Sequence, residues 1–190
     1  MLNVPALLNA QEQKATPSFS TVYKDSLAHF PLENLKGKEA AITPSGSLQV
    51  LIFLSPECPI CVNYTRTLNT LARNFAGSVT FTGIVPGRTY SAKDIKRFIN
   101  SYDFLIETYR DPTMKFSRYM QATITPEVIV MDTSGAIRYR GAIDDWIISI
   151  GKKKEKPTEF YLENALNQLV NNELVRLPLT QPKGCFINDY

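Results

Sequence analysis

The sequence predicts an α/β domain with a mixed central β-sheet flanked by helices on both faces. Apolar runs of strand length occur at 50–54, 79–85 and 127–131, and segments with helical periodicity alternate with them. The 190-residue chain is 44% hydrophobic, which is enough for one core. The expected order of elements is β–β–α–β–α–(β)–α–β–β–α, and this alternation favours a layered α/β fold.

Turn residues and apolar spacing define the elements of the first half. The turn at 44–47 predicts that Glu39–Thr43 and Leu48–Leu54 form a hairpin. After Cys61, apolar residues at i, i+3, i+4 and i+7 predict a helix that stops at Gly77; they are Leu68, Leu71, Ala72 and Phe75. Residues 79–85 are β-rich and end at Pro86–Gly87, so a strand is expected there.

The second half gives three clear signals and two weaker ones. Ser91 and Asp94 form a capping box that opens a helix. Residues 127–131 and 137–141 flank a Gly-containing turn and predict a hairpin, and an apolar stripe from Leu162 to Val170 predicts a final helix. Phe104–Ile106 suggests a short strand. Asp111–Pro112 suggests the start of a short helix that runs through Tyr119.

Composition divides the chain into three parts and argues against two kinds of partner. Residues 1–18 are expected to be an N-terminal segment, either disordered or the remnant of an export signal, 19–177 the domain and 178–190 a C-terminal tail. The net charge is only +3, and the basic run 152–156 contains Glu155 and precedes Pro157, so we expect a solvated loop and no nucleic-acid binding. No stretch approaches the roughly 20 apolar residues of a membrane span.

Two cysteines, Cys58 and Cys61, are the strongest functional signal. The motif Cys58-Pro59-Ile60-Cys61 follows an apolar strand, begins a helix and has Ser55, Pro56 and Glu57 as its neighbours. Pro59 suits the first helical position, so Cys58 falls near the N-cap, where the helix dipole favours a thiolate. The pattern predicts a redox site in which Cys58 is the nucleophile and Cys61 the resolving thiol.

Other uses of two cysteines fit the sequence less well. A disulfide that closes so small a loop stabilises little. Haem attachment requires His after the second cysteine, where Val62 stands, and zinc would need two more ligands from Cys185 and His29, which have no recognisable spacing. We therefore predict no metal and no cofactor beyond a redox-active Cys58–Cys61 disulfide.

From about Phe30 to Val170, the chain resembles the thioredoxin-like redoxin group. The resemblance rests on Pro31–Lys38, the strand that ends at the CxxC motif, Gly83–Gly87, Thr125–Pro126 and Val130–Gly135. It implies a thioredoxin-like fold and thiol–disulfide exchange with protein substrates and an electron donor or acceptor. It also implies that Pro126 is cis beside the cysteines and that the backbone of Thr125 pairs with an extended substrate segment.

The chain departs from thioredoxins at positions that matter for the chemistry. Glu57 replaces a Trp, Pro-Ile replaces Gly-Pro between the cysteines, and Ile52 stands where that family places a buried acid. Because a nearby negative charge disfavours a thiolate, Glu57→Gln is expected to lower the pKa of Cys58.

Two further functions stay open at this point. A peroxiredoxin-like peroxidase needs Thr or Ser three residues before the cysteine, which Ser55 supplies, and Pro seven before, where Leu51 stands. A Cu(I) chaperone would use Cys58 and Cys61, with His29 and Met120 as candidates by residue type. The bacterial periplasm or another extracytoplasmic compartment is the expected location, with the cytoplasm as the alternative.

The third cysteine, Cys185, admits two interpretations. Free cysteines are often buried as small apolar residues, which would place Cys185 under the C-terminal tail. Alternatively, Cys185 is a third redox thiol that pairs with Cys58 or with a partner.

Overall fold

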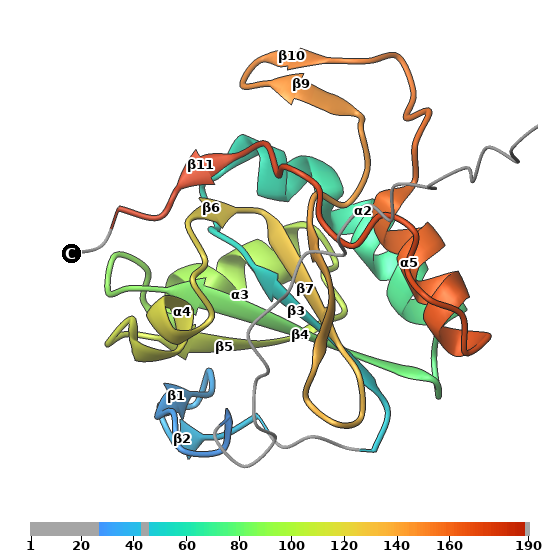
Figure 1. Ribbon diagram of the computed structural model, residues 1–190. Coiled ribbons are helices and arrows are strands. Elements are labelled where there is room, and N and C mark those ends of the chain that lie inside the picture. Colours follow the sequence, from blue (N-terminus) through green and yellow to red (C-terminus); the bar gives the residue numbers. More distant parts are fainter. Residues whose placement is uncertain (1–26, 43–45, 189–190) are drawn as a thin grey trace, which may run out of the picture.

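A seven-stranded sheet forms the centre of the computed structural model, which describes residues 27–42 and 46–188 (Figure 1). In sheet order, its strands are β2 (Glu39–Ala40), β1 (Leu32–Glu33), β5 (Glu107–Asp111), β4 (Val79–Pro86), β3 (Leu48–Phe53), β7 (Glu127–Met131) and β8 (Ile137–Gly141). β3, β4 and β5 are parallel, whereas β7 is antiparallel to both β3 and β8. The predicted mixed sheet and the hairpin after residue 127 are confirmed.

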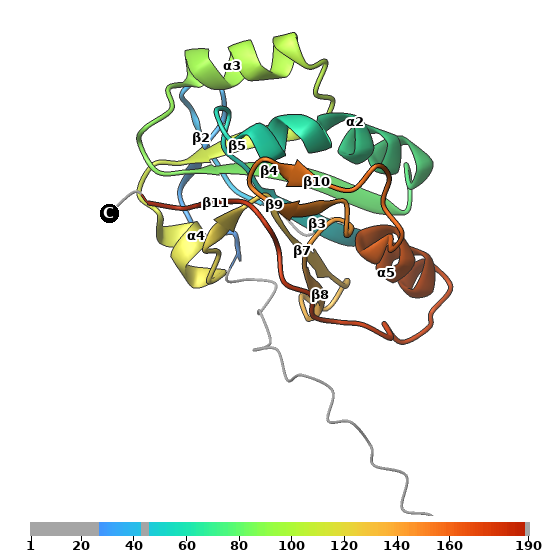
Figure 2. The ribbon, with the colours of Figure 1, turned by 90° about the horizontal axis from the view of Figure 1, so that it is seen from above.

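Helices cover both faces of the sheet, as predicted (Figure 2). Side chains of β3 alternate: Val50 and Ile52 enter one core cluster, and Leu51 and Phe53 enter the other. The first cluster receives α2 (Pro59–Asn74), α3 (Ala92–Ser101) and α5 (Tyr161–Val170), and the second receives α4 (Lys115–Tyr119). β3 is therefore buried on both faces, and the cysteines at its end lie on the side of α2.

The starts of the three long helices, and the ends of α2 and α5, lie at or near the residues that the sequence predicts. α2 starts with Pro59 in its first turn and ends at the C-cap Phe75, two residues before Gly77, whose φ is +86°. α3 begins at a complete capping box: the Ser91 Oγ accepts from the backbone N–H of Asp94 at 3.2 Å, and the Asp94 carboxylate accepts from that of Ser91 at 3.0 Å. These ends are local, so sequence signals suffice to place them.

The predicted hairpin between Glu39–Thr43 and Leu48–Leu54 is wrong. β2 pairs with β1 at the edge of the sheet, and β3 lies between β4 and β7. Five of the six residues of β3 are buried, so this strand needs neighbours on both sides, while the short β2 is partly exposed and suits an edge. Residues 43–45, within the connection between them, lie outside the described part of the chain.

Two shorter elements are shifted from their predicted positions. The strand expected at Phe104–Ile106 lies further along the chain, as β5, which begins at Glu107. Phe104 and Ile106 belong to the connection between α3 and β5, and their side chains pack into the first core cluster. The helix expected from Asp111 starts at Lys115; Asp111 ends β5, and its carboxylate accepts from the backbone N–H of Ser117 at 2.7 Å. Part of the predicted basic loop forms the exposed strand β10 (Lys152–Lys153), paired with β9 (Ile147–Ser149).

The C-terminal residues return to the sheet. The backbone N–H of Thr180 donates to the Arg140 carbonyl at 3.0 Å, and that of Arg140 donates to the Pro178 carbonyl at 2.9 Å. Further on, β11 (Cys185–Phe186) pairs antiparallel with β6 (Ile124–Thr125). Most of the predicted tail, 178–188, is thus bound along β8 and β6.

The N-terminal segment predicted at 1–18 lies outside the described residues. Within the described part of the chain, none of the helices has the length and apolar character needed to cross a membrane.

Candidate active site

The junction between β3 and α2 places both cysteines at one end of the sheet. Cys58 is the N-cap of α2, with an extended backbone, and its carbonyl accepts the N–H of Val62 at 3.1 Å. Both cysteines are buried: Cys58 is 3% exposed and Cys61 is 2% exposed. The sequence therefore placed the N-cap and the first turn correctly.

The two thiols differ strongly in acidity. A hydrogen bond from the Cys61 thiol is the largest influence on Cys58 and, with a smaller one from Cys185, lowers its pKa from 9.0 to about 5 against the opposing effect of burial. Burial, and then the interaction with Cys58, raises the pKa of Cys61 well above its usual value. The Ser55 backbone N–H donates to the Cys61 sulfur at 3.4 Å. Cys58 is thus a thiolate at neutral pH, and Cys61 holds a proton beside it.

Thr125, the residue before Pro126, lies beside the cysteines. The Thr125–Pro126 peptide bond is cis, as the resemblance implied. The Cys58 thiol, when protonated, donates to the Thr125 carbonyl at 3.3 Å. The backbone of Thr125 is therefore within reach of any group bonded to the Cys58 sulfur.

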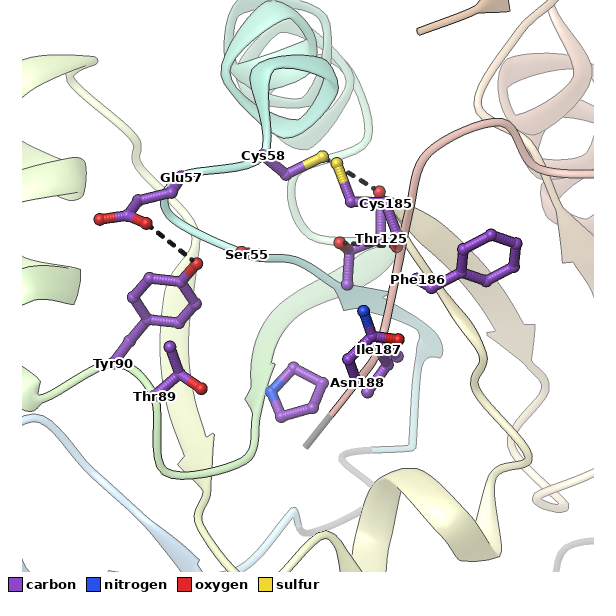
Figure 3. A pocket seen from close by; sticks show the side chains of 11 residues that line it. Ser55, Glu57, Cys58, Thr89, Tyr90, Thr125, Cys185, Phe186, Ile187 and Asn188 are labelled. Atoms are coloured by element: carbon purple, nitrogen blue, oxygen red, sulfur yellow. Dashed lines mark hydrogen bonds between the residues drawn. The ribbon is translucent and has the colours of Figure 1, made fainter. Parts of the chain in front are cut away.

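A cavity of about 490 Å³ opens at the Cys58 sulfur. It is lined by Ser55, Glu57, Cys58, Pro86, Thr89, Tyr90, Thr125 and the C-terminal residues Cys185–Asn188 (Figure 3). The exposed Glu57 carboxylate points away from Cys58 and accepts from the Tyr90 hydroxyl at 3.5 Å. The neighbouring Pro56, Pro59 and Ile60 are not among the lining residues; Ile60 is buried in the core.

Cys185 contributes to this cavity, which sequence reasoning did not establish. Its side chain is half-buried, and Figure 3 shows its sulfur next to that of Cys58. Burial and the neighbouring Cys58 raise the pKa of Cys185 to about 12. The sequence signal was only the motif Gly184-Cys185 in an apparent tail. Thr89 and Tyr90 were missed because nothing in their local pattern relates them to the cysteines.

The acids near the site are not at the position that the family comparison suggested. Ile52 is fully buried in the core, so that position holds no acid. Glu127 follows Pro126, is 4% exposed, and forms an ion pair with Arg140 at 3.0 Å; its pKa is raised because burial outweighs the arginine. Asp144, also buried, accepts from the Tyr64 hydroxyl. Sequence patterns missed both carboxylates, since each follows a strand or loop whose packing was unknown.

Of the residues proposed for the alternative functions, Ser55 lines the cavity at Cys58, whereas Leu51 and Met120 lie on the other face of the sheet. Met120 is buried in the second core cluster, on the opposite face of the sheet from Cys58, and His29 is exposed. Leu51, at the position where a peroxidase would have Pro, is also in the second cluster. Among the described residues, no group of three His, Cys, Asp or Glu side chains is arranged to hold a metal. The candidate ligand Met120 is thus wrong by position.

The sheet order, the helices on both faces and the cis-proline beside the helix start define the thioredoxin-like fold, as predicted. The chain is similar to a hypothetical protein from Sinorhizobium meliloti, with a TM-score of 0.78, 19% identity, and coverage of 91% of this chain and 96% of the other. It is also similar to an uncharacterized conserved protein from Geobacillus kaustophilus, with a TM-score of 0.68, 21% identity, and coverage of 85% and 88%.

A secreted disulfide oxidoreductase from Mycobacterium tuberculosis has the same fold, with a TM-score of 0.55, 19% identity, and coverage of 78% of this chain and 98% of the other. No protein-family model matches the sequence, and a search of curated proteins found no significant match. At these identities the likeness establishes the fold, and the chemistry has to be argued from the site.

Proposed function

We propose that the protein is a thiol–disulfide oxidoreductase that exchanges disulfides with protein substrates. The observation that carries this proposal is the opposite acidity of two adjacent thiols, with the pKa of Cys58 lowered to about 5 and that of Cys61 raised. A nucleophile that is ionised at neutral pH and a partner that stays protonated until needed are the two groups that disulfide exchange requires.

The reaction proceeds in two balanced steps. The Cys58 thiolate attacks one sulfur of a substrate disulfide, a mixed disulfide forms, and the other substrate sulfur leaves as a thiolate. Cys61 then loses its proton and attacks the Cys58 sulfur, which releases the second substrate thiol and leaves a Cys58–Cys61 disulfide. The substrate gains two electrons and the protein loses two. A dithiol donor returns the protein to its reduced form, and the reverse sequence oxidises a substrate.

Thr125 is the proposed binding position for the substrate backbone. Its carbonyl lies 3.3 Å from the Cys58 sulfur, so an extended peptide bonded to Cys58 would run beside β6. Strand addition supplies main-chain hydrogen bonds that do not depend on the peptide sequence, which suits an enzyme that acts on protein disulfides. A bacterial extracytoplasmic compartment is the proposed location, because disulfides persist there; cell fractionation with a specific antibody tests it.

The test is a redox titration of the protein in glutathione buffers, with mass spectrometry reading each cysteine. We expect Cys58 and Cys61 to pair reversibly, and the midpoint to say whether the protein donates or accepts electrons. Cys58→Ser should abolish reduction of a protein disulfide, whereas the double variant Cys61→Ser with Cys185→Ser, which lacks both neighbouring thiols, should accumulate a mixed disulfide at Cys58. Failure of the pair to form, or full activity of Cys58→Ser, would reject the proposal.

A further inference from the structure

The C-terminal segment occupies the position proposed for the substrate. β11 pairs antiparallel with β6, with Cys185 opposite Thr125 and Phe186 opposite Ile124. The Ile187 backbone N–H donates to the Thr123 carbonyl at 3.0 Å, which extends the ladder. A peptide added to β6 would need this same edge. The chain therefore binds its own C-terminal segment where a substrate strand would bind.

The register of this strand brings a thiol to the nucleophile. Cys185 is opposite Thr125, the residue whose carbonyl contacts Cys58. Figure 3 shows the two sulfurs adjacent, and a hydrogen bond from Cys185 is one of the interactions that stabilise the Cys58 thiolate. Within the docked segment, the residue that contacts the nucleophile is thus the one residue able to form a disulfide with it.

The segment is seated by backbone contacts that tolerate no side chain at Gly184. A Cβ at this position would lie 2.1 Å from the Thr125 carbonyl oxygen, whereas real Cβ contacts essentially never fall below 3.0 Å. Just before this segment, Thr180 holds the chain to the end of β8: its Oγ accepts from the Ala142 backbone N–H at 2.9 Å. Gly184 thus permits the close approach that places Cys185 in register.

We propose that the C-terminal segment 183–188 is an internal substrate of the site and that Cys185 is a third redox thiol, which forms a disulfide with Cys58. This inference rests on the proposed function and adds a partner to it. From the oxidised state, the Cys185 thiolate attacks Cys58, the Cys58–Cys61 bond breaks, and Cys61 leaves as a thiolate that takes up the proton lost by Cys185. No electrons are gained or lost overall, so the step needs no further oxidant.

The electrostatics make this step depend on the redox state. Two of the three causes that raise the pKa of Cys185 are its hydrogen bond and charge interaction with Cys58. Both require the Cys58 thiolate, which is absent once Cys58 is in a disulfide. Cys185 is therefore held protonated beside reduced Cys58 and becomes easier to ionise when Cys58 is oxidised. While the Cys58–Cys185 bond lasts, an external substrate strand is excluded from β6.

The experiment uses full-length Cys61→Ser, which cannot resolve through Cys61, treated with oxidised glutathione. Cys58 first forms a glutathione adduct, and Cys185 then displaces glutathione. We expect mass spectrometry after alkylation to find a Cys58–Cys185 disulfide without bound glutathione. A stable glutathione adduct at Cys58, with Cys185 still free and therefore alkylated, would overturn this inference but leave the proposed function standing. If Cys58 stays a free thiol, with neither a glutathione adduct nor a disulfide to Cys185, the proposed function fails, and this inference with it.

Gly184→Ala in the Cys61→Ser background is the matched variant, because it keeps both thiols and changes only the seating of the strand. Its Cβ forces a displacement of about 1 Å, and such a displacement can slow an intramolecular reaction by about a hundredfold. We expect the same rate of glutathione adduct formation, or a faster one, and at least about tenfold slower conversion to the internal disulfide. Unchanged conversion would show that the docked strand does not position Cys185.

Discussion

The pH dependence of Cys58 gives the sharpest test of the site. With the pKa lowered from 9.0 to about 5, Cys58 is about 99% ionised at pH 7, whereas an ordinary thiol is about 1% ionised. A more acidic thiolate is also a weaker nucleophile: with a Brønsted coefficient of about 0.4–0.5, its intrinsic reactivity falls by roughly 40- to 100-fold. At pH 7 the two effects nearly cancel, so the absolute rate there says little.

The slope of the alkylation rate against pH distinguishes an acidic Cys58 thiol from an ordinary thiol. Between pH 8 and pH 6, the alkylation rate of an ordinary thiol falls about tenfold per pH unit, whereas that of Cys58 changes by only about a tenth. At pH 6, Cys58 should therefore react roughly ten to twenty times faster than an equally accessible ordinary thiol. This advantage is expected to grow as the pH falls toward 5.

The assay is ultraviolet thiolate absorbance across pH, with the Cys58→Ser profile subtracted, together with peptide-resolved alkylation by iodoacetamide. Cys61→Ala should raise the midpoint, because the Cys61 hydrogen bond is the largest influence that lowers the pKa of Cys58. A wild-type midpoint near 8 or 9, or a rate that rises tenfold per pH unit between pH 6 and pH 8, would refute this account of the thiolate.

Three further predictions concern single side chains. Glu57→Gln should lower the pKa of Cys58, but by less than Cys61→Ala raises it, because the Glu57 carboxylate points away from Cys58 toward Tyr90. The same absorbance titration measures this pKa, and a higher pKa in Glu57→Gln would contradict the prediction. Tyr64→Phe removes the hydroxyl that donates to Asp144, and it should lower the free energy of unfolding, measured with urea at neutral pH, by about 1–3 kcal/mol. An unchanged free energy of unfolding would indicate that water replaces the hydroxyl. Ser91→Ala removes the N-cap of α3 and should cost about 1 kcal/mol in the same assay, whereas Ser91→Asp should retain most of the stability.

Local signals in the sequence predicted much of this protein. The N-cap at Cys58, the capping box at Ser91, the hairpin after Glu127 and the final helix all depend on residues within one or two turns of each other. The resemblance to thioredoxin-like proteins added Thr125 and Pro126, which are 67 and 65 residues from Cys58 and Cys61 in the chain. The structure makes the bond before Pro126 cis, as that resemblance implied, and places the Thr125 carbonyl against Cys58.

Strand pairing was less predictable, because it is decided by partners that are distant in sequence. Glu39–Ala40 and Leu48–Phe53 are separated by a turn-like segment, yet burial of β3 on both faces assigns them different neighbours. The same reason explains the missed acids: Glu127 meets Arg140 only across the β7–β8 pairing region, and Asp144 meets Tyr64 only when α2 packs on the loop after β8.

The sequence by itself determined the two groups on which the proposed function rests: two thiols at the start of a helix, one of them at the positive end of its dipole. It did not determine what faces those thiols. Only the tertiary structure decided that Cys185, 127 residues beyond Cys58, pairs with Thr125 and reaches the same sulfur. The physical reason is that a helix start is specified by neighbours in the chain, whereas strand addition depends on which backbone edge the folded sheet leaves open.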